Sequence, residues 1–278
     1  MSGTLYLVPT PIGNLSDISD RCRDTLRSVD FIAAEDTRVT LRLLNHLQIK
    51  KPLVSYYEHN KEISGPKIVE RLCSGESCAL VTDAGSPAIS DPGEDLVCLC
   101  AQAGVPVTAI PGPCAAVTAL SVSALPTGRF TFEGFLSTAK KSRFAHLDSL
   151  RAEKRTMIFY EAPHKLTATL ADMVQTFGPD RSVSLCRELT KLHEDTQRTT
   201  LQGAVDHYQT REPRGEYVLV VAGAEASREP ALTLEEGVAR VLGLRQQGQP
   251  MKSAVRQVAA DTGLNKNELY AAVLQAQA

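Results

Sequence analysis

The stretch LYLVPTPIGNLSDISDRCRDTLRSVDFIAA, residues 5–34, decides the fold class of this 278-residue chain. It begins with a short apolar run at residues 5–8 and ends with another at residues 31–34. The apolar residues between these runs recur at helical spacing and are Ile18, Cys22, Leu26 and Val29. Two buried strands joined by an amphipathic helix form a βαβ unit, and such units build parallel sheets. The sequence therefore predicts an α/β fold.

The same alternation of apolar runs and helical periodicity continues to about residue 125. The further strands are expected at residues 53–56, 79–82 and 105–110, and the helices at 61–73, 93–103 and 113–124. The segment LPTG at residues 125–128 then interrupts the pattern with a proline and a glycine, which are typical of a boundary. We therefore assign residues 1–125 to an N-terminal α/β domain.

The rest of the chain divides into a second α/β domain and a helical extension. Residues 126–224 carry strand-like runs at 130–136, 155–160, 182–187 and 217–222. A polar segment at 226–229 predicts a linker, and residues 225–278 contain three helical stripes with the turn DTGL before the last one. Helix, glycine-containing turn and helix is the spacing of a helix-turn-helix motif, but a simple three-helix packing unit fits equally well.

Composition limits the classes of function. Lys and Arg number 30 against 32 Asp and Glu, so the formal net charge of −2 excludes a nucleic-acid footprint that covers the whole chain. No apolar run approaches the roughly 18 residues of a membrane helix, and the first residues lack a signal-peptide pattern. The seven cysteines show no CxxC pair or zinc spacing. We expect a cytoplasmic protein with no membrane partner and no metal site.

Three loops that follow predicted strands are the candidate ligand site, because ligands of open α/β sheets bind beyond the carboxyl ends of the strands. They are PTPIGN at 9–14, DAGSPAISDPG at 83–93, and PGPCAA at 111–116. The first two are rich in proline and glycine, and the third starts a helix with small side chains that leave its first N–H groups uncovered. Each loop read alone also fits ordinary turns and caps. We expect the three to converge on one hollow.

Acidic residues in other loops are candidates for proton transfer. Glu35, Asp36 and Arg38 follow the second predicted strand. Two carboxylates at this position could take up a proton or bind a cation. The alternative is that these residues form a helix cap with a neighbouring ion pair. Glu161 follows a strand of the second domain and is expected to form one wall of an interdomain cleft. The segment GEY at 215–217 begins a strand, so in a parallel arrangement we expect it to lie far from the ligand edge.

Seven motifs in this order resemble one family. They are VPTPIGNL at 8–15, AAEDTR at 33–38, DAGSPAISDPG at 83–93, PGPCAA at 111–116, EGFL at 133–136, FYEAPHK at 159–165 and RELTK at 187–191. Together they are similar to the ribosomal RNA small-subunit 2′-O-ribose methyltransferases of the tetrapyrrole methylase, or class III S-adenosylmethionine-dependent, superfamily. The resemblance runs from residue 5 to about residue 224 and includes the C-terminal helices.

The resemblance implies a two-domain tetrapyrrole-methylase-like fold with a mainly parallel first sheet, a mixed second sheet and a helix-turn-helix-like extension. It also implies a homodimer that binds S-adenosylmethionine between the two domains. The cofactor-binding residues implied are Pro11, Gly13, Asp83, Gly85, Ser86, Ile89, Pro113, Cys114, Ala115 and Tyr160. The superfamily often has Gly-Asp-Pro where this chain has Ser86, so a carboxylate is missing there.

The acceptor implied by the resemblance is the ribose 2′-hydroxyl of a cytidine in small-subunit rRNA, within the assembled 30S subunit. Glu35 and Asp36 are the first candidates for the base, with Arg38 positioning a phosphate or the acid, and Glu161 and His59 follow. Because the net charge is near zero, binding of RNA would need a local basic surface. One candidate is the C-terminal helices, and the other is the cluster of Lys140, Lys141, Arg143, Lys154 and Arg155. Both are equally consistent with solvated helix faces. The alternatives are a small-molecule tetrapyrrole methylase and a non-catalytic RNA-binding or ribosome-assembly module.

Overall fold

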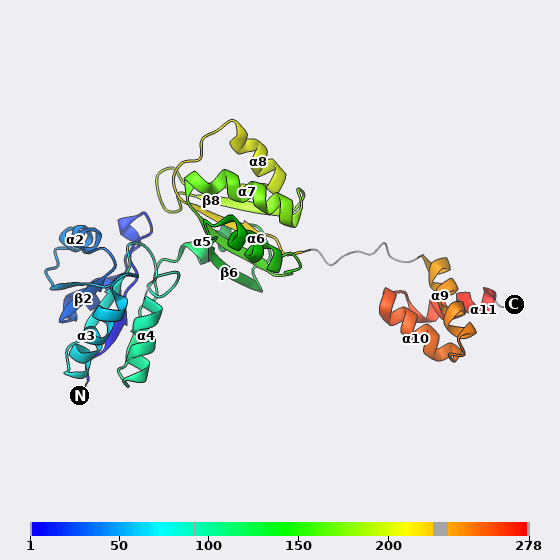
Figure 1. Cartoon of the computed structure of the whole chain (residues 1–278), viewed down its shortest axis with the longest axis horizontal. Helices are drawn as coiled ribbons and strands as arrows, with labels where there is room; N and C mark the ends of the chain where they lie inside the picture. The colour runs from blue at the N-terminus through cyan, green and yellow to red at the C-terminus, as the bar shows by residue number, and fades with distance from the viewer. Residues whose placement is uncertain (1, 92, 225–232, 277–278) are drawn as a thin grey trace. The chain divides into compact units, whose positions relative to one another are not determined.

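A computed structural model of the chain describes residues 2–91, 93–224 and 233–276. The chain divides into two compact units, residues 1–224 and 225–278 (Figure 1). The predicted boundary near residue 125 lies inside the first unit and stays a prediction. The predicted linker at 226–229 lies outside the described residues.

The first sheet is parallel throughout its described strands, which confirms the prediction from the opening βαβ unit. Its strand order is β3-β2-β4-β1-β5. The strands are β1 (Leu5–Leu7), β2 (Phe31–Ala34), β3 (Leu53–Ser55), β4 (Cys78–Val81) and β5 (Val107–Ala109). All residues of β2 and β4 are buried, as expected for parallel strands that are covered on both faces.

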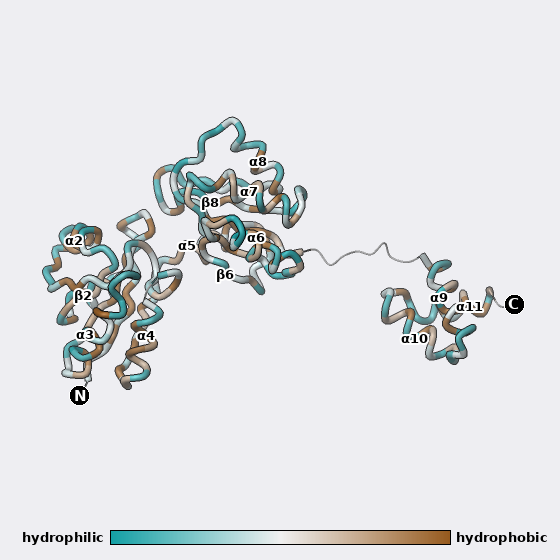
Figure 2. The backbone as a smooth tube through the Cα atoms, in the orientation of Figure 1, coloured by the Kyte–Doolittle hydropathy of each residue, from teal (hydrophilic) through white to brown (hydrophobic). Residues whose placement is uncertain are grey.

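Helices cover both faces of this sheet because successive strand residues point to opposite sides. Ile32 packs in one cluster with α1 (Asp20–Ser28) and α2 (Thr37–His46). Its neighbour Phe31 packs in another with α3 (Lys61–Cys73) and α4 (Gly93–Gln102), which lie side by side in Figure 1. Hydrophilic and hydrophobic residues alternate along these helices, as Figure 2 shows, so each keeps one face for the sheet.

The second sheet is mixed, as the family resemblance implied. Its strand order is β6-β7-β10-β8-β9; the β6–β7 pairing is parallel and the other pairings are antiparallel. The strands are β6 (Phe130–Phe135), β7 (Thr156–Glu161), β8 (Ser182–Arg187), β9 (Asp195–Thr200) and β10 (Tyr217–Val221). Strand β9 was not predicted, because its residues DTQRTT contain no apolar run.

The two faces of the second sheet are covered by different parts of the chain. One face carries the helices α6 (Lys140–Ser149), α7 (Pro163–Phe177) and α8 (Leu201–Gln209). The other face packs against α5 (Ala115–Val122), where Ala116, Ala119 and Leu120 contact residues of β7, β8 and β10. The helix that leaves the first sheet therefore closes the core of the second.

The second unit consists of α9 (Leu234–Gln246), α10 (Met251–Thr262) and α11 (Lys266–Ala276) around a small core centred on Val241 and Val258. Thr233 and Glu236 form a capping box at the start of α9. Gly263 ends α10 with a φ of 73°, a conformation that glycine adopts at little cost. The three predicted helices are thus confirmed.

Candidate active site

Three loops of the first sheet are joined directly to one another. Thr10 and Gly85 exchange two backbone hydrogen bonds of 2.9 and 3.1 Å, and the Thr10 hydroxyl donates to the Thr82 carbonyl at 3.0 Å. The Ser86 hydroxyl donates to the Pro113 carbonyl at 2.9 Å. Because β4, β1 and β5 are neighbours in the sheet, the loops after them meet at its carboxyl edge. The predicted convergence of the three loops is confirmed.

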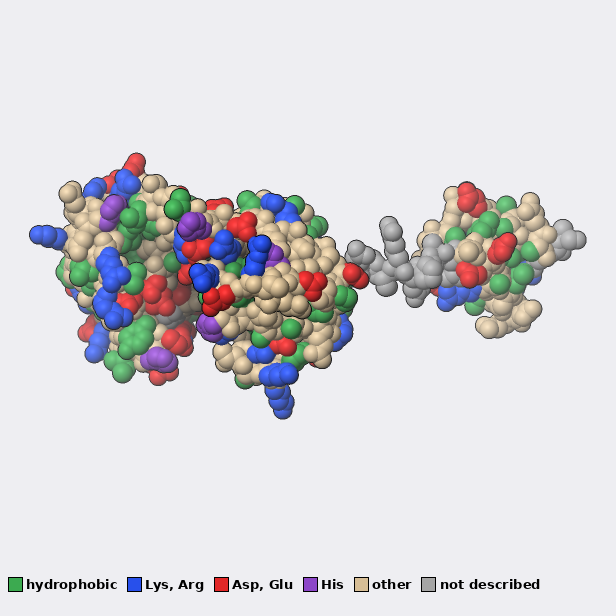
Figure 3. Space-filling view, turned by 90° about the horizontal axis from the view of Figure 1, so that it is seen from above, with side chains coloured by type: hydrophobic (Ala, Val, Ile, Leu, Met, Phe, Trp, Pro, Cys, Tyr) green, Lys and Arg blue, Asp and Glu red, His purple; other side chains and the backbone are tan. Residues whose placement is uncertain are grey.

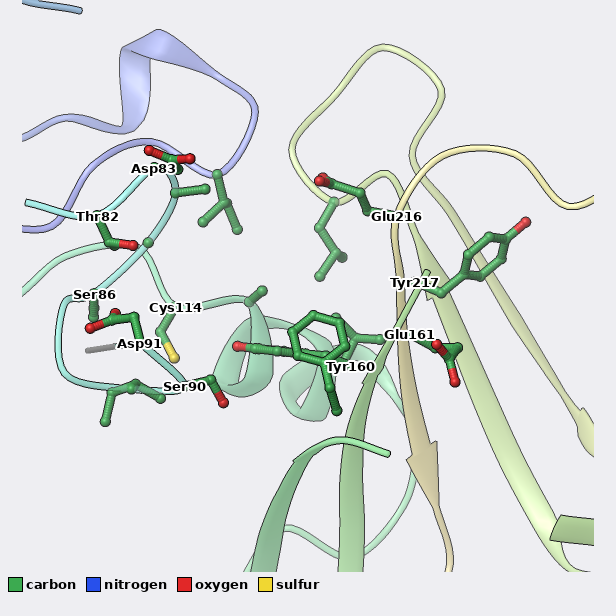
Figure 4. Close-up of a pocket in the computed structure, with 18 of the residues that line it drawn as sticks. Thr82, Asp83, Ser86, Ser90, Asp91, Cys114, Tyr160, Glu161, Glu216 and Tyr217 are labelled. Carbon is green, nitrogen blue, oxygen red and sulfur yellow. The ribbon is translucent and has the colours of Figure 1, made fainter. Parts of the chain in front are cut away.

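A cavity of about 450 Å³ lies between these loops and the second sheet (Figure 4). Its charged lining residues are all acidic: Glu35, Asp83, Asp91, Glu161 and Glu216. The other lining residues described are Ile12, Thr82, Ala84, Gly85, Ser86, Ile89, Ser90, Cys114, Ala115, Phe135, Tyr160, Ala162, Pro163, Cys186, Leu189, Tyr217 and Val218. No described Lys, Arg or His lines the cavity, and of its five acids Glu216 is paired with Lys191, which lies outside the described lining. The other acids make the site suited to a cationic ligand.

Glu35 lies where the ends of β2 and β4 meet. Its Oε2 accepts a hydrogen bond of 2.6 Å from the Thr82 hydroxyl, and the Asp36 amide donates to Asp83 Oδ1 at 3.2 Å. Burial raises the pKa of Asp83, and the nearby charge of Glu35 raises it further. The cavity therefore has an oriented carboxylate and, beside it, a carboxyl that holds its proton more tightly than usual.

Asp36 and Arg38 are not part of the described cavity lining. Asp36 Oδ2 accepts from Arg38 Nη2 at 2.6 Å and its Oδ1 accepts from the Arg38 amide at 2.8 Å, at the start of α2. These hydrogen bonds hold the pKa of Asp36 well below its usual range. The contacts match the cap and ion pair given as the alternative, and Glu35 is the acid of this loop that faces the cavity.

Glu161 is buried, and both its oxygens have donors. Oε1 accepts from the Ala162 amide at 2.8 Å and Oε2 from the Thr169 hydroxyl at 2.5 Å. Figure 4 shows its carboxyl and the Tyr160 hydroxyl on opposite sides of β7, as strand alternation requires. The contacts favour an anchor for α7, and a proton-accepting role for Glu161 stays a prediction.

Tyr160 connects the second sheet to the third loop. Its hydroxyl accepts a hydrogen bond of 3.2 Å from the Ala116 amide in the first turn of α5. Its ring makes edge contacts with Phe132 and Phe135 at centroid distances of 5.0 and 5.4 Å. Burial raises the pKa of Tyr160 to about 12, so the phenol stays protonated at neutral pH.

Backbone strain is concentrated around the cavity. Six described residues other than glycine have a positive φ, and four of them flank it: Ala88 and Ser90 at 67° and 63°, and Glu188 and Thr190 at 52° and 66°. Such conformations persist only where neighbouring contacts fix them, and they gather at functional sites. Asp91 provides that fixation for the second loop, because its Oδ1 accepts from the Ala88 and Gly93 amides at 2.8 and 2.9 Å.

The start of β10 lies at the ligand edge, which corrects the expectation for residues 215–217. Glu216, Tyr217 and Val218 line the cavity, and Figure 4 shows the Glu216 carboxyl and the Tyr217 ring pointing in opposite directions. The expectation assumed a parallel strand, whereas β10 is antiparallel to β7 and β8 and begins where they end. Lys191 Nζ joins Glu216 to Glu188 with hydrogen bonds of 2.9 and 2.8 Å.

The cofactor residues implied by the resemblance fall into two groups. Those that line the cavity are Asp83, Gly85, Ser86, Ile89, Cys114, Ala115 and Tyr160. The others are Pro11, which lines a neighbouring cavity, and Gly13 and Pro113, which are outside the described lining. A Cβ on Gly13 would lie 3.0 Å from the Leu189 carbonyl oxygen, so this glycine lets the first loop touch the loop after β8. The cofactor role of all ten stays a prediction.

The basic cluster proposed near α6 is partly engaged in internal contacts. Arg143 donates to Asp172 at 2.7 Å, and Arg155 forms a two-point pair with Glu153. Figure 3 shows Lys and Arg mixed with Asp and Glu on the face in view. His59 is exposed and is not part of the described cavity lining.

The described part of the chain contains neither a metal-binding cluster nor a membrane-spanning helix. No group of three or more His, Cys, Asp or Glu residues there is arranged to hold a metal ion. No helix among the described residues is long and apolar enough to cross a bilayer.

Comparison with known proteins identifies both units. Residues 4–205 match the tetrapyrrole (corrin/porphyrin) methylases, and residues 232–277 match the RsmI C-terminal HTH domain. Ribosomal RNA small subunit methyltransferase I of Synechocystis is 46% identical over 276 residues, covering 99% of each chain. Its namesake in Escherichia coli O157:H7 is 44% identical and covers 99% of this chain and 96% of its own. The enzyme of the same name from Bacillus subtilis is 45% identical, and the match covers 96% of this chain and 93% of that protein.

Solved structures support the fold at lower identity. Uroporphyrin-III C-methyltransferase of Thermus thermophilus is 17% identical with a TM-score of 0.56, over 78% of this chain and 94% of its own. Cobalt precorrin-4 methyltransferase is 18% identical with a TM-score of 0.59, and the match covers 79% of this chain and 94% of that protein. The cavity thus lies in a fold found in several methyltransferases, and the full-length similarity is to the rRNA enzymes. The chain belongs to the tetrapyrrole methylase family and, within it, to the ribosomal RNA small subunit methyltransferases I.

Proposed function

We propose that the chain uses S-adenosylmethionine to methylate the 2′-hydroxyl of a cytidine ribose in small-subunit rRNA. The observation that carries this proposal is the cavity whose charged lining is entirely acidic, because the methyl donor carries a positive sulfonium and an ammonium group. Small-subunit rRNA as the substrate follows the names of the full-length relatives, and the ribose 2′-hydroxyl follows the resemblance of the sequence motifs. The cytidine, the assembled 30S subunit as substrate, the homodimer and the cytoplasmic location are also parts of this proposal.

The residues of the cavity fit the cofactor. Cys114 is the N-cap of α5, and its side chain makes no capping hydrogen bond. Apart from the Ala116 N–H, which donates to the Tyr160 hydroxyl, the first N–H groups of the helix can therefore meet an adenine edge or a carboxylate. Cys114 and Ala115 are small, and Gly85 with a φ of 90° lets the second loop pass close by. Ile12, Ile89 and Leu189 supply the apolar contacts that a flat purine needs.

The bound cofactor would supply an electrophilic methyl group, and its transfer cancels charge. The main contribution of the protein is therefore alignment, which includes holding the acceptor oxygen at about 3 to 3.5 Å from the methyl carbon. Glu35 is suited to take the hydroxyl proton, because Thr82 fixes Oε2 and Oε1 accepts no hydrogen bond from the described residues. A base of this kind contributes about 10² to 10⁴-fold to the rate.

Product analysis with the wild-type chain tests the reaction. Unmethylated small ribosomal subunits are incubated with isotopically labelled S-adenosylmethionine, the rRNA is digested, and the nucleosides are identified by mass spectrometry. A 2′-O-methylcytidine is the expected product. Methyl groups on a base, or no transfer at all, would refute the proposal.

Substitution of the loop acids tests their roles. Glu35→Gln should lower kcat at least about 100-fold and change the cofactor Kd less than about threefold, since it removes the base but keeps the shape. Asp36→Asn is the comparison and should depress turnover less, because Asp36 caps α2 outside the cavity. If both variants methylate at the native rate, neither acid is the base.

A further inference from the structure

A second cavity of about 260 Å³ adjoins the first, and the two share Thr82 and Asp83 in their walls. The first loop and α2 form the rest of it. The described lining residues are Thr10, Pro11, Leu15, Val39, Thr40, Arg42, Leu43, His46, Thr82 and Asp83. The shared wall lies beside Glu35, the acid placed nearest to the acceptor hydroxyl. A ligand that reacts there has room to extend into the second cavity.

The charge of the second cavity differs from that of the first. Val39, Arg42 and His46 recur every three or four residues, so they share the face of α2 that lines the cavity. Arg42 is exposed and forms no ion pair with any described residue, whereas Arg38, one turn earlier, is held by Asp36. The first cavity, whose charged lining residues are acidic, is therefore bordered by a second cavity that contains the guanidinium of Arg42.

We propose that the second cavity binds the phosphodiester next to the acceptor ribose and that Arg42 is its cationic contact. This inference rests on the proposed function. The 2′-oxygen and the 3′-phosphate are attached to neighbouring ribose carbons, so a ribose at the shared wall brings its phosphate beside that wall. Asp83, which lines both cavities, is the one acid among the described lining residues of the second cavity, whereas the first has five. A phosphate is therefore repelled more strongly from the first cavity, and Arg42 attracts it to the second. Leu15 and Val39, which are 46% and 36% exposed, offer apolar contact to the adjoining nucleoside.

Kinetics with Arg42→Gln test this site, with Arg21→Gln on α1 as the matched control. Arg21 is also exposed and without an ion pair among the described residues, but it does not line either cavity. Arg42→Gln should raise the KM for small ribosomal subunits about tenfold and leave the cofactor Kd within twofold. Each phosphate contact contributes about 0.7 to 0.9 to the slope of log affinity against log salt, so the slope should become shallower by that amount. Arg42→Lys should recover most of the affinity.

The same variants distinguish the other occupants. Equal KM values and equal salt slopes for Arg42→Gln and Arg21→Gln would overturn the inference. A weakened cofactor Kd, or a changed elution volume in size-exclusion chromatography, would also overturn it, because the cavity would then hold cofactor or a second copy of the chain. Subunit binding measured without cofactor decides the role of Arg42 independently of turnover. Failure of the wild type to methylate ribose refutes only the proposed function.

Discussion

Asp91 holds the strained second loop in shape, and its replacement should damage the cavity without touching its base. Its Oδ1 accepts from the Ala88 and Gly93 amides at 2.8 and 2.9 Å. Ala88 and Ser90 keep φ values of 67° and 63° in this loop. In Asp91→Ala, two amides lose their acceptor and nothing fixes the strained conformation. The loop should therefore relax.

The size of the effect follows from these contacts. Hydrogen bonds to a charged group contribute about 1.5 to 3 kcal/mol each, so two represent about 3 to 6 kcal/mol. Relaxation of two strained residues returns about 1 kcal/mol or more each. The free energy of unfolding should fall by about 2 kcal/mol, which lowers the Tm by roughly 4 to 8 °C in a unit of this size. Reordering the loop on binding costs similar free energy, so cofactor affinity should fall about 10- to 30-fold.

Asp91→Asn is the control, because its amide oxygen can still accept both hydrogen bonds. Burial raises the pKa of Asp91, so the folded chain disfavours the carboxylate. The part of the stability that is linked to the proton of Asp91 is therefore complete below the unfolded pKa and is lost as the pH rises through the folded pKa, whereas the two backbone hydrogen bonds remain. Calorimetry should show the Tm of Asp91→Asn rising relative to the wild type as the pH increases above about 4 and the wild-type carboxyl ionises. Equal losses of cofactor affinity in the Ala and Asn variants would refute the argument.

Three further substitutions test the walls of the cavity. Ala115→Leu should abolish cofactor binding in titration calorimetry while the circular dichroism spectrum stays native, because the new side chain fills the cavity. Tyr160→Phe should lower the Tm by about 2 to 4 °C, since the Ala116 amide loses its acceptor, worth about 1 kcal/mol. Gly13→Ala should weaken cofactor binding about tenfold, although Gly13 does not line the described cavity. The reason is that the new Cβ would lie 3.0 Å from the Leu189 carbonyl oxygen and would push the two loops apart. Unchanged affinity would show that the two loops move independently.

The strands β2 and β4 of the first sheet were predictable from sequence because they are buried on both faces. The runs FIAA and CALV are entirely apolar, and the structure places them in β2 and β4. The range predicted for α3 matches the observed helix at both ends. A continuous apolar run marks such a strand without information from the rest of the chain.

The elements that escaped prediction have mixed or polar composition. Among the described strands, β9 pairs only with β8, at the edge of its sheet, and its residues are half-buried or exposed. An edge strand with little buried surface needs no apolar run, so the sequence carries no period-2 pattern to find. Its position is set by the backbone pairing of Ser182–Arg187 with Asp195–Thr200, and pairing is a property of the fold.

The candidate site was predictable only as far as it depends on the parallel sheet. The loops after β1, β4 and β5 meet because those strands are neighbours, and sequence spacing with the family resemblance was enough to select them. The resemblance implied a mixed second sheet but not the direction of β10, which decides which end of this strand faces the ligand. An antiparallel strand brings its first residue to the edge where a parallel strand brings its last, which is why Glu216 contributes a carboxylate to the cavity. The acidic character of the site is therefore built by both sheets. The loops after β2 and β4 supply Glu35, Asp83 and Asp91, and the mixed sheet adds Glu161 from the end of β7 and Glu216 from the residue before β10.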